Sequence, residues 1–340
     1  MTTGRVGAAA TAFALVLLTA APAGAHTTSG PPASNYATVL GGLRPRADGV
    51  IVSLAPDRES LELRVTGAAH VTILGYRDEP YLRVDARGVF ENLASPAVVI
   101  NRSRIPSSIA PPHPSARTAG EARWVRISDQ PIARWHDHRA HWMGGATPSA
   151  VRRDPNRTQV ITAWEIPIRV DRALGTISGT IRWDPPPASW PWWVFAAALA
   201  GGVLVAVRTR TARAKLVGVV LAMAGVEALH FWAAWPFSLG TTVGRIGEGL
   251  PSIGAVLVCL VALGWVARRG VWSAAPALVL AGLFVFVSGG LADLPTLSHA
   301  HAPSRLAPEV ARLLVSLALG LGLGITLVGA TRLRAPRPST

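Results

Sequence analysis

Hydrophobic and polar residues are distributed very differently in the two halves of the chain. Up to about Pro191, apolar residues come in short runs rich in β-branched side chains, which glycine, proline and aspartate separate. Such runs predict β-strands, and their close spacing is typical of an antiparallel sandwich. After Pro191 the chain contains long apolar stretches of the length that a membrane-spanning helix needs.

Seven runs in the first half are predicted to form strands. They cover residues 50–54, 61–65, 71–74, 123–127, 132–138, 159–170 and 176–183. Between them, residues 102–122 are rich in proline and serine and predict an exposed loop, while consecutive prolines within residues 184–191 predict a stiff linker. The pattern therefore predicts one all-β sandwich domain, cupredoxin-like or immunoglobulin-like, over residues 26–183.

The first 25 residues have the features of a secretory signal peptide. Arg5 precedes an apolar run over residues 8–21, and small residues follow up to Ala25. Charge, apolar core and an Ala-x-Ala end together predict cleavage after Ala25. His26 would then be the first residue of the mature chain.

Five apolar stretches predict five transmembrane helices in a domain over residues 192–331. They lie near residues 191–207, 216–235, 249–267, 274–294 and 310–330. Arginines and one lysine gather between the first two stretches, between the third and fourth, and in the tail, residues 332–340. By the positive-inside rule these clusters are cytoplasmic. We therefore expect a multi-pass plasma-membrane protein with its β-domain outside and its C-terminus inside.

Composition supports this organisation. Half of the residues are hydrophobic and only 15% are charged, which excludes a disordered chain. The net charge of +14 is partly explained by membrane topology, so it does not indicate nucleic acid as a partner. Cys259 is the single cysteine of the sequence, and this excludes an internal disulfide and a cysteine-based zinc site. It lies in an apolar stretch.

A histidine cluster in the β-domain is the strongest candidate for chemistry. Three of the nine histidines, His136, His138 and His141, lie within residues 133–143. In a strand, His136 and His138 share a face, with Cα atoms about 7 Å apart, which suits two ligands of one metal ion. His141 breaks the alternation and could be a third ligand, an outer residue or a separate site. Alternatively, all three are ordinary polar surface residues.

An N-terminal His26 would add a chelate to these histidines. Its α-amino nitrogen and its ring could bind one ion together, as a histidine brace, and the amine holds its proton weakly, with a pKa of about 7.7–8.0. With two further imidazoles the ligand set becomes all-nitrogen. Tetragonal nitrogen coordination is typical of Cu(II), which also binds such ligands most tightly.

These residues resemble the B subunit of particulate methane and ammonia monooxygenases. In that family an exported cupredoxin domain binds copper through its N-terminal histidine and a Trp-His-x-His pair, which implies His26, His136 and His138 as ligands. That family has two cupredoxin domains and two spans, whereas this sequence predicts one domain and five spans. Monooxygenase activity therefore does not follow. The chain also resembles exported-domain membrane proteins of GC-rich Gram-positive bacteria, which implies no particular activity.

The membrane half contains a second set of candidate ligands. Glu227 and His230 lie on one helical face, Asp293 ends the fourth stretch, and His299 and His301 follow it. Ionisable groups inside a span usually face the bundle interior or a pathway, so these five residues could form a second metal site. Alternatively, Glu227 and His230 pair with each other or with a helix neighbour, and His299 and His301 are solvated.

Other motifs receive structural interpretations. Gly320, Gly322 and Gly324 lie within the fifth stretch, where small residues predict close helix packing. The acidic residues Asp57 and Glu59 are predicted to be solvated turn residues. The sequence contains no phosphate-binding loop, nucleophile elbow or His-Glu-x-x-His zinc motif, so whether the protein is an enzyme stays open.

The leading hypothesis is a copper-binding membrane protein of the cell surface, which handles or delivers copper as Cu(II) or Cu(I). The ligands would be His26, His136 and His138, with His141 nearby. Its partners would be the lipid bilayer and exported copper proteins or an oxidase complex. The alternatives are a subunit of a copper-dependent membrane monooxygenase or oxidase, and a metal-free membrane assembly factor.

Overall fold

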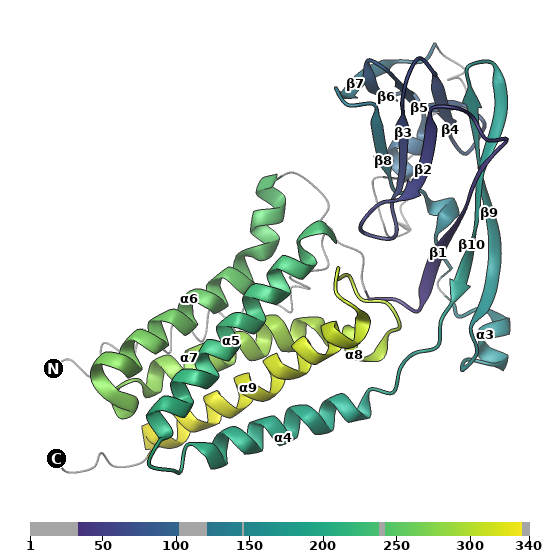
Figure 1. Ribbon diagram of the computed structural model, residues 1–340. Helices are drawn as coiled ribbons and strands as arrows, with labels where there is room; N and C mark the ends of the chain where they lie inside the picture. The colour runs from purple at the N-terminus through teal and green to yellow at the C-terminus, as the bar shows by residue number, and fades with distance from the viewer. Residues whose placement is uncertain (1–32, 102–120, 145, 238–241, 335–340) are drawn as a thin grey trace. The chain divides into compact units, whose positions relative to one another are not determined.

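The computed structural model describes residues 33–101, 121–144, 146–237 and 242–334 (Figure 1). The chain divides into two compact units, one of residues Ser34–Pro186 and one that includes everything from Pro187 onwards. The division falls within residues 184–191, the proline-rich segment predicted to link the β-domain to the apolar helices. The predicted signal peptide and His26 lie outside the described residues.

The first unit is an antiparallel β-sandwich, as the sequence predicts. Its larger sheet has seven strands in the order β1 (Tyr36–Arg44), β10 (Ala173–Trp183), β9 (Gln159–Val170), β4 (Val71–Leu74), β5 (Pro80–Asp85), β6 (Gly88–Asn92) and β7 (Trp124–Ser128). Its smaller sheet has three strands in the order β2 (Val50–Leu54), β3 (Leu61–Val65) and β8 (Ile132–Trp135). Two short α-helices, α2 (Pro96–Ile100) and α3 (Ser149–Arg153), and a 3₁₀ turn, η1 (His138–Ala140), complete the described part of this unit.

Both sheets bury their apolar faces in one core. Leu61 and Leu63 of β3 and Ile166 and Ile168 of β9 are fully buried and belong to the same hydrophobic cluster. Residues two apart in a strand point to the same face, so Leu61 and Leu63, like Ile166 and Ile168, present both side chains to the core. Burying each such side chain contributes about 1.5–3 kcal/mol relative to leaving it exposed.

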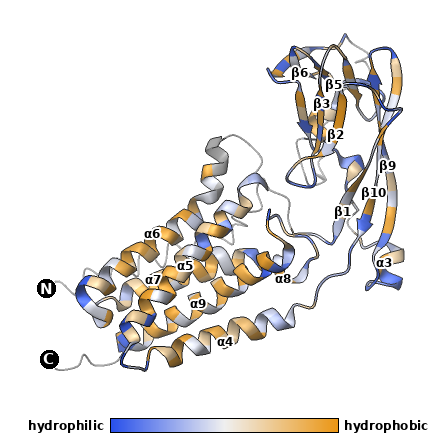
Figure 2. Cartoon of the chain, in the orientation of Figure 1, coloured by the Kyte–Doolittle hydropathy of each residue, from blue (hydrophilic) through white to orange (hydrophobic). Residues whose placement is uncertain are grey.

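The second unit is a bundle of apolar helices (Figure 2). Its main elements are α4 (Trp190–Ala206), α5 (Ala212–Ala234), α6 (Thr242–Ser273), α7 (Ala275–Val285) and α9 (Pro308–Arg334). Between α7 and α9 the chain forms a π-helix η3 (Phe286–Gly290), a 3₁₀ turn η4 (Leu291–Asp293) and the short helix α8 (Pro295–Ser298).

The prediction of five spanning helices is not fully met. Within the described ranges, four helical stretches are long and apolar enough to cross a membrane: Ala212–Ala234, Gly249–Ser273, Ala275–Asp293 and Pro308–Arg334. The remaining apolar helix, α4, which comes first in the chain, has 17 residues. At 1.5 Å per residue it is about 25 Å long, against about 30 Å for the hydrocarbon core. The four helices are compatible with a multi-pass membrane protein, whose orientation stays a prediction.

The glycines of α9 allow the close helix packing that the sequence predicts. A Cβ atom on Gly320 would lie 2.6 Å from the carbonyl oxygen of Ala196 in α4. One on Gly322 would lie 2.8 Å from the carbonyl oxygen of Gly282 in α7. Both distances are shorter than a Cβ atom can approach a carbonyl oxygen. Helices α4 and α7 can therefore lie this close to α9 only because Gly320 and Gly322 carry no side chain.

Candidate metal site

The histidines of the β unit come together around a turn rather than along a strand. Strand β8 ends at Trp135, because the side chain of Asp137 accepts a hydrogen bond from Arg139 N and caps the 3₁₀ turn η1 (His138–Ala140). The prediction that His136 and His138 share one strand face is therefore wrong. The turn instead returns the chain so that the residue after it, His141, lies beside His136.

His136 and His141 form the closest pair of the three. Their rings are stacked, with centroids 4.1 Å apart and planes at 13°. The His138 ring meets His136 edge-on, with centroids 5.4 Å apart. The structure therefore gathers the three predicted histidines but makes His141, rather than His138, the nearest partner of His136.

A carboxylate completes a possible ligand set. Glu59, His136 and His141 each offer one ligand atom, and these atoms lie within 4.8 Å of one another. Metal–nitrogen bonds are about 2.0–2.1 Å, so ligand atoms on opposite sides of an ion are about 4 Å apart. The separation of these three ligand atoms is therefore close to that of atoms that bind one ion. In the described part of the chain, this is the only group of three or more candidate ligands that lie this close together.

Sequence reasoning missed Glu59 because strand pairing, not local sequence, places it at the site. Residue Leu61 pairs with Trp135, so the residues just before β3 lie next to those just after β8. Asp57 fixes the turn: its carboxylate accepts hydrogen bonds from Glu59 N at 3.1 Å and Ser60 N at 2.8 Å. The interpretation of Asp57 as a solvated turn residue is wrong, since Asp57 is buried. Glu59 lies in the same turn, half-buried, and its carboxylate lies near the ligand atoms of His136 and His141.

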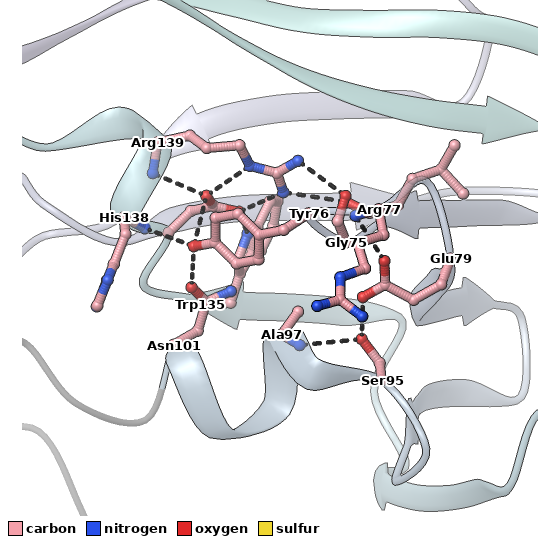
Figure 3. A network of polar contacts seen from close by, with 12 residues as sticks. Gly75, Tyr76, Arg77, Glu79, Ser95, Ala97, Asn101, Trp135, His138 and Arg139 are labelled. Carbon is pink, nitrogen blue, oxygen red and sulfur yellow. Dashed lines mark hydrogen bonds and ion pairs between the residues drawn. The ribbon is translucent and has the colours of Figure 1, made fainter. Parts of the chain in front are cut away.

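A buried ion pair holds the histidine turn in place (Figure 3). Asp137 is fully buried, and Arg139 binds it with two hydrogen bonds of 2.9 Å, from Nε to Oδ1 and from Nη2 to Oδ2. The indole N–H of Trp135 also donates to Asp137, at 3.1 Å. Arg139 further donates to the backbone carbonyls of Leu74 and Gly75, at 3.0 and 3.2 Å. The turn is thereby fixed to the end of β4.

Tyr76 joins this network from the same side. Its hydroxyl accepts a hydrogen bond from His138 N at 3.1 Å and donates one to Asn101 Oδ1 at 2.5 Å. Burial, together with the negative charge of Asp137, raises the pKa of Tyr76 well above its usual value. For Arg139, burial acts to lower the pKa, but hydrogen bonds and attraction to Asp137 outweigh it and raise the pKa. The network thus keeps a neutral phenol beside a permanent cation.

A threonine of β1 orients the ring of His141. Thr38 Oγ1 donates its one hydrogen to the carbonyl oxygen of Ala140, at 2.6 Å. The same oxygen lies 3.3 Å from His141 Nδ1, so it can only accept a hydrogen bond there. With the proton on Nδ1, Nε2 is the nitrogen through which the His141 ring would bind a metal ion, and an oxygen that orients the ring in this way is usual for metal-binding histidines.

The candidate ligands of the membrane unit are arranged differently. His230 Nε2 lies 3.0 Å from Asp293 Oδ2, so these two form a pair across the bundle. Glu227 is fully buried beside Ser288, and His299 Nδ1 lies 2.8 Å from the carbonyl oxygen of Pro295. Among the described residues, no three of Glu227, His230, Asp293, His299 and His301 meet the spacing of a metal site.

Comparisons with models of protein families, with curated proteins and with solved structures find no match for this chain. The function therefore has to be inferred from the chemistry of the site.

Proposed function

We propose that the protein is a membrane-anchored copper-binding protein whose β unit holds Cu(II) through His136, His141 and Glu59. The observation that carries the proposal is the convergence of two imidazoles and one carboxylate to within 4.8 Å. The Asp137–Arg139 pair supports it, because a buried, doubly hydrogen-bonded network restricts the turn that presents both rings.

Copper is the metal that this ligand set favours most. Imidazole nitrogens bind divalent copper more tightly than any other first-row metal, although zinc and ferrous iron also occur in sites of two histidines and a carboxylate. His138, beside His136, is a fourth candidate ligand. His26 remains a predicted fifth, because its amine and ring would complete the nitrogen-rich set that Cu(II) prefers.

The arrangement supports binding and release of copper. Neutral imidazole and ionised carboxylate are the forms that bind metal, so protons compete with the ion and binding is reversible with pH. We therefore propose copper handling or delivery at the membrane, with exported copper proteins or an oxidase complex as partners. Catalysis as an oxidase or monooxygenase subunit would require a substrate to reach the bound ion.

Metal titration of the full-length protein tests the proposal. The protein is purified in detergent without metal, and copper stoichiometry and the Cu(II) spin-resonance spectrum are recorded, with zinc and ferrous iron as competitors. We expect one copper per chain, and a loss of affinity greater than about tenfold in His136→Ala and His141→Ala. Glu59→Gln should alter the spectrum. His70→Ala is the control, because His70 is an exposed histidine paired with Asp85 elsewhere in the same unit.

Two outcomes would contradict the proposal. Wild-type affinity in the double variant of His136 and His141 would place any copper elsewhere, and tighter binding of zinc than of copper would change the metal. A variant with one extra residue before His26 tests the N-terminal chelate separately. An unchanged copper spectrum in that variant would remove His26 from the ligand set while leaving the site at His136 intact.

A further inference from the structure

The core of the membrane unit contains a carboxyl group that the proposed copper site does not use. Glu227 lies on α5 and is among the most completely buried large side chains of the protein. Ionisable residues in a membrane interior are costly and usually mark a functional site. Its surroundings therefore need a physical explanation.

The chain is shaped to admit the Glu227 carboxyl group. Opposite it, η3 is a π-helix, a rare form that often occurs at functional sites. Within η3, a Cβ atom on Gly289 would lie 2.1 Å from Glu227 Oε1, so only glycine leaves space for the carboxyl. Ser288 Oγ lies 3.4 Å from the same oxygen, and the buried Ser252 on α6 is a further polar neighbour.

In the part of the bundle that the structure describes, no permanent cation contacts this carboxyl group. Across the described residues, no hydrogen bond or ion pair joins Glu227 to an arginine or lysine, and Glu227 Oε2 has no hydrogen bond within 3.5 Å. The titratable groups that face it are His230 on its own helix, Asp293 on η4 and the thiol of Cys259 on α6. An ionised carboxylate without an arginine or lysine partner is costly in such a medium, so the site favours a carboxyl that carries a proton.

A polar route leads from Glu227 towards one end of the bundle. His230 lies almost one turn further along α5, and its Nε2 contacts Asp293 Oδ2 at 3.0 Å. Both residues line a cavity of about 20 Å³ together with Thr296 and Ser304, which is room for about one water. Because α5 ends at Ala234, seven residues after Glu227, the route covers roughly 10 Å of helix.

We infer that Glu227 is a proton-binding site inside the membrane, which exchanges its proton with one end of the bundle through the His230–Asp293 pair. The proton leaves the carboxyl O–H of Glu227 and is carried by His230 as an imidazolium, which the carboxylate of Asp293 stabilises. It then passes to water in the adjoining cavity. The reverse sequence restores the carboxyl group, and no electron transfer is involved.

Labelling with dicyclohexylcarbodiimide tests the proton site. A protonated carboxyl adds to this apolar reagent: the acid oxygen bonds to the central carbon, the proton moves to nitrogen, and the adduct rearranges to a stable acylurea. In full-length protein in lipid vesicles, we expect mass spectrometry to find the adduct on Glu227, with less labelling as the pH rises. Glu309 is the matched control, because it is an exposed glutamate on α9 beside Arg312 and should not be labelled.

Infrared spectroscopy in D₂O tests the route. The carbonyl band of the protonated Glu227 should shift on deuteration, and it should be absent in Glu227→Gln. Exchange should be slower by about tenfold or more in Asp293→Asn and in His230→Phe. The wild-type measurements need no variant, so they stand even if one variant fails to fold.

Three results would overturn parts of the inference. Absence of both the adduct and the carbonyl band at every pH would show that Glu227 stays ionised, and the proton site would be wrong. Unchanged exchange in both Asp293→Asn and His230→Phe would refute the route. Protection of Glu227 from labelling by one equivalent of copper or by sodium would identify a cation site instead. None of these results depends on copper binding at His136 and His141.

Discussion

Replacing Asp137 with alanine should make the β unit easier to unfold and should weaken copper binding at the proposed site. Asp137 and Arg139 form a doubly hydrogen-bonded pair in which the carboxylate is fully buried and the arginine side chain is 18% exposed. The substitution removes the anion and leaves the guanidinium largely out of contact with water. It also removes the cap of the turn that carries His138.

The structure sets the size of the effect. Breaking a buried ion pair by removing one partner costs about 3–5 kcal/mol. Arg139 keeps its two backbone carbonyl acceptors, which places the pair at the lower end of that range, while loss of the cap adds about 1 kcal/mol. We therefore expect Asp137→Ala to lower the free energy of unfolding by about 4 kcal/mol.

The chain provides a closely matched control in Asp184. Arg182 and Asp184 are also two residues apart in sequence and joined by three side-chain hydrogen bonds, the shortest of them 2.8 Å. That arginine is 41% exposed and Asp184 is 16% exposed, however, so this pair is in greater contact with water than Arg139 and Asp137 are. Asp184→Ala should cost no more than about 1 kcal/mol. The two substitutions therefore compare the same chemistry at different burial.

Denaturant unfolding of the full-length protein in detergent, followed by tryptophan fluorescence, measures both variants. Trp135 donates to Asp137 and should report directly on the turn. Copper affinity is measured in parallel and should fall about 10- to 100-fold in Asp137→Ala, as for other residues that orient metal ligands. Equal stability losses in the two variants would refute the argument from burial. A large stability loss with unchanged copper affinity would show that the network supports the fold but not the site.

Two further predictions concern the phenol beside the site and the helix contacts. Since Tyr76 keeps its proton in the folded state above the unfolded value of about 10, the folded state binds more protons, and stability should fall as the pH rises beyond about 10. Tyr76→Phe should flatten this fall in urea unfolding curves recorded at increasing pH, and an unchanged slope would contradict the assignment. Gly322→Leu should destabilise the helix bundle by about 1–3 kcal/mol in thermal unfolding followed by circular dichroism, because it separates α9 from Gly282. Gly218→Ala, on an open part of α5, should be neutral or slightly stabilising, and equal effects of both changes would argue against close packing.

Regular patterning made much of the fold predictable. Four strands, β2, β3, β4 and β9, have the bounds that their β-branched runs predict. The long apolar stretches likewise identified every main helix of the membrane unit, although α4 is shorter than a typical span. These elements repeat one local rule over many residues, so a single sequence is sufficient to locate them.

Strands without such a pattern were missed. β1 contains two adjacent glycines, Gly41 and Gly42, and its register with β10 shifts between Leu40 and Gly42. β5 begins with Pro80 and contains charged residues. Their strand conformation depends on pairing with neighbours in the large sheet, which is information from distant parts of the chain.

The candidate metal site likewise has one part that local sequence predicts and one part that depends on strand pairing. The histidines were recognisable because they are close in sequence, but their arrangement depends on the cap at Asp137 and on the ion pair that holds it. Glu59 could not be found locally, because the pairing of β3 with β8 brings it to the histidines from about eighty residues away. Local sequence therefore identified the histidines of the site, whereas the register between β3 and β8 determined that Glu59 lies beside them.

The two buried acids, Asp137 and Glu227, show how neighbouring charge decides what a buried carboxyl group can do. Asp137 is bound by two hydrogen bonds from Arg139, so its carboxyl group is committed to orienting the turn. The described neighbours of Glu227 include the hydroxyl of Ser288, at 3.4 Å, and a histidine that is itself paired with Asp293. A carboxyl without its own cation changes its protonation state more readily than one with a cation. The first is therefore suited to a structural role and the second to proton exchange.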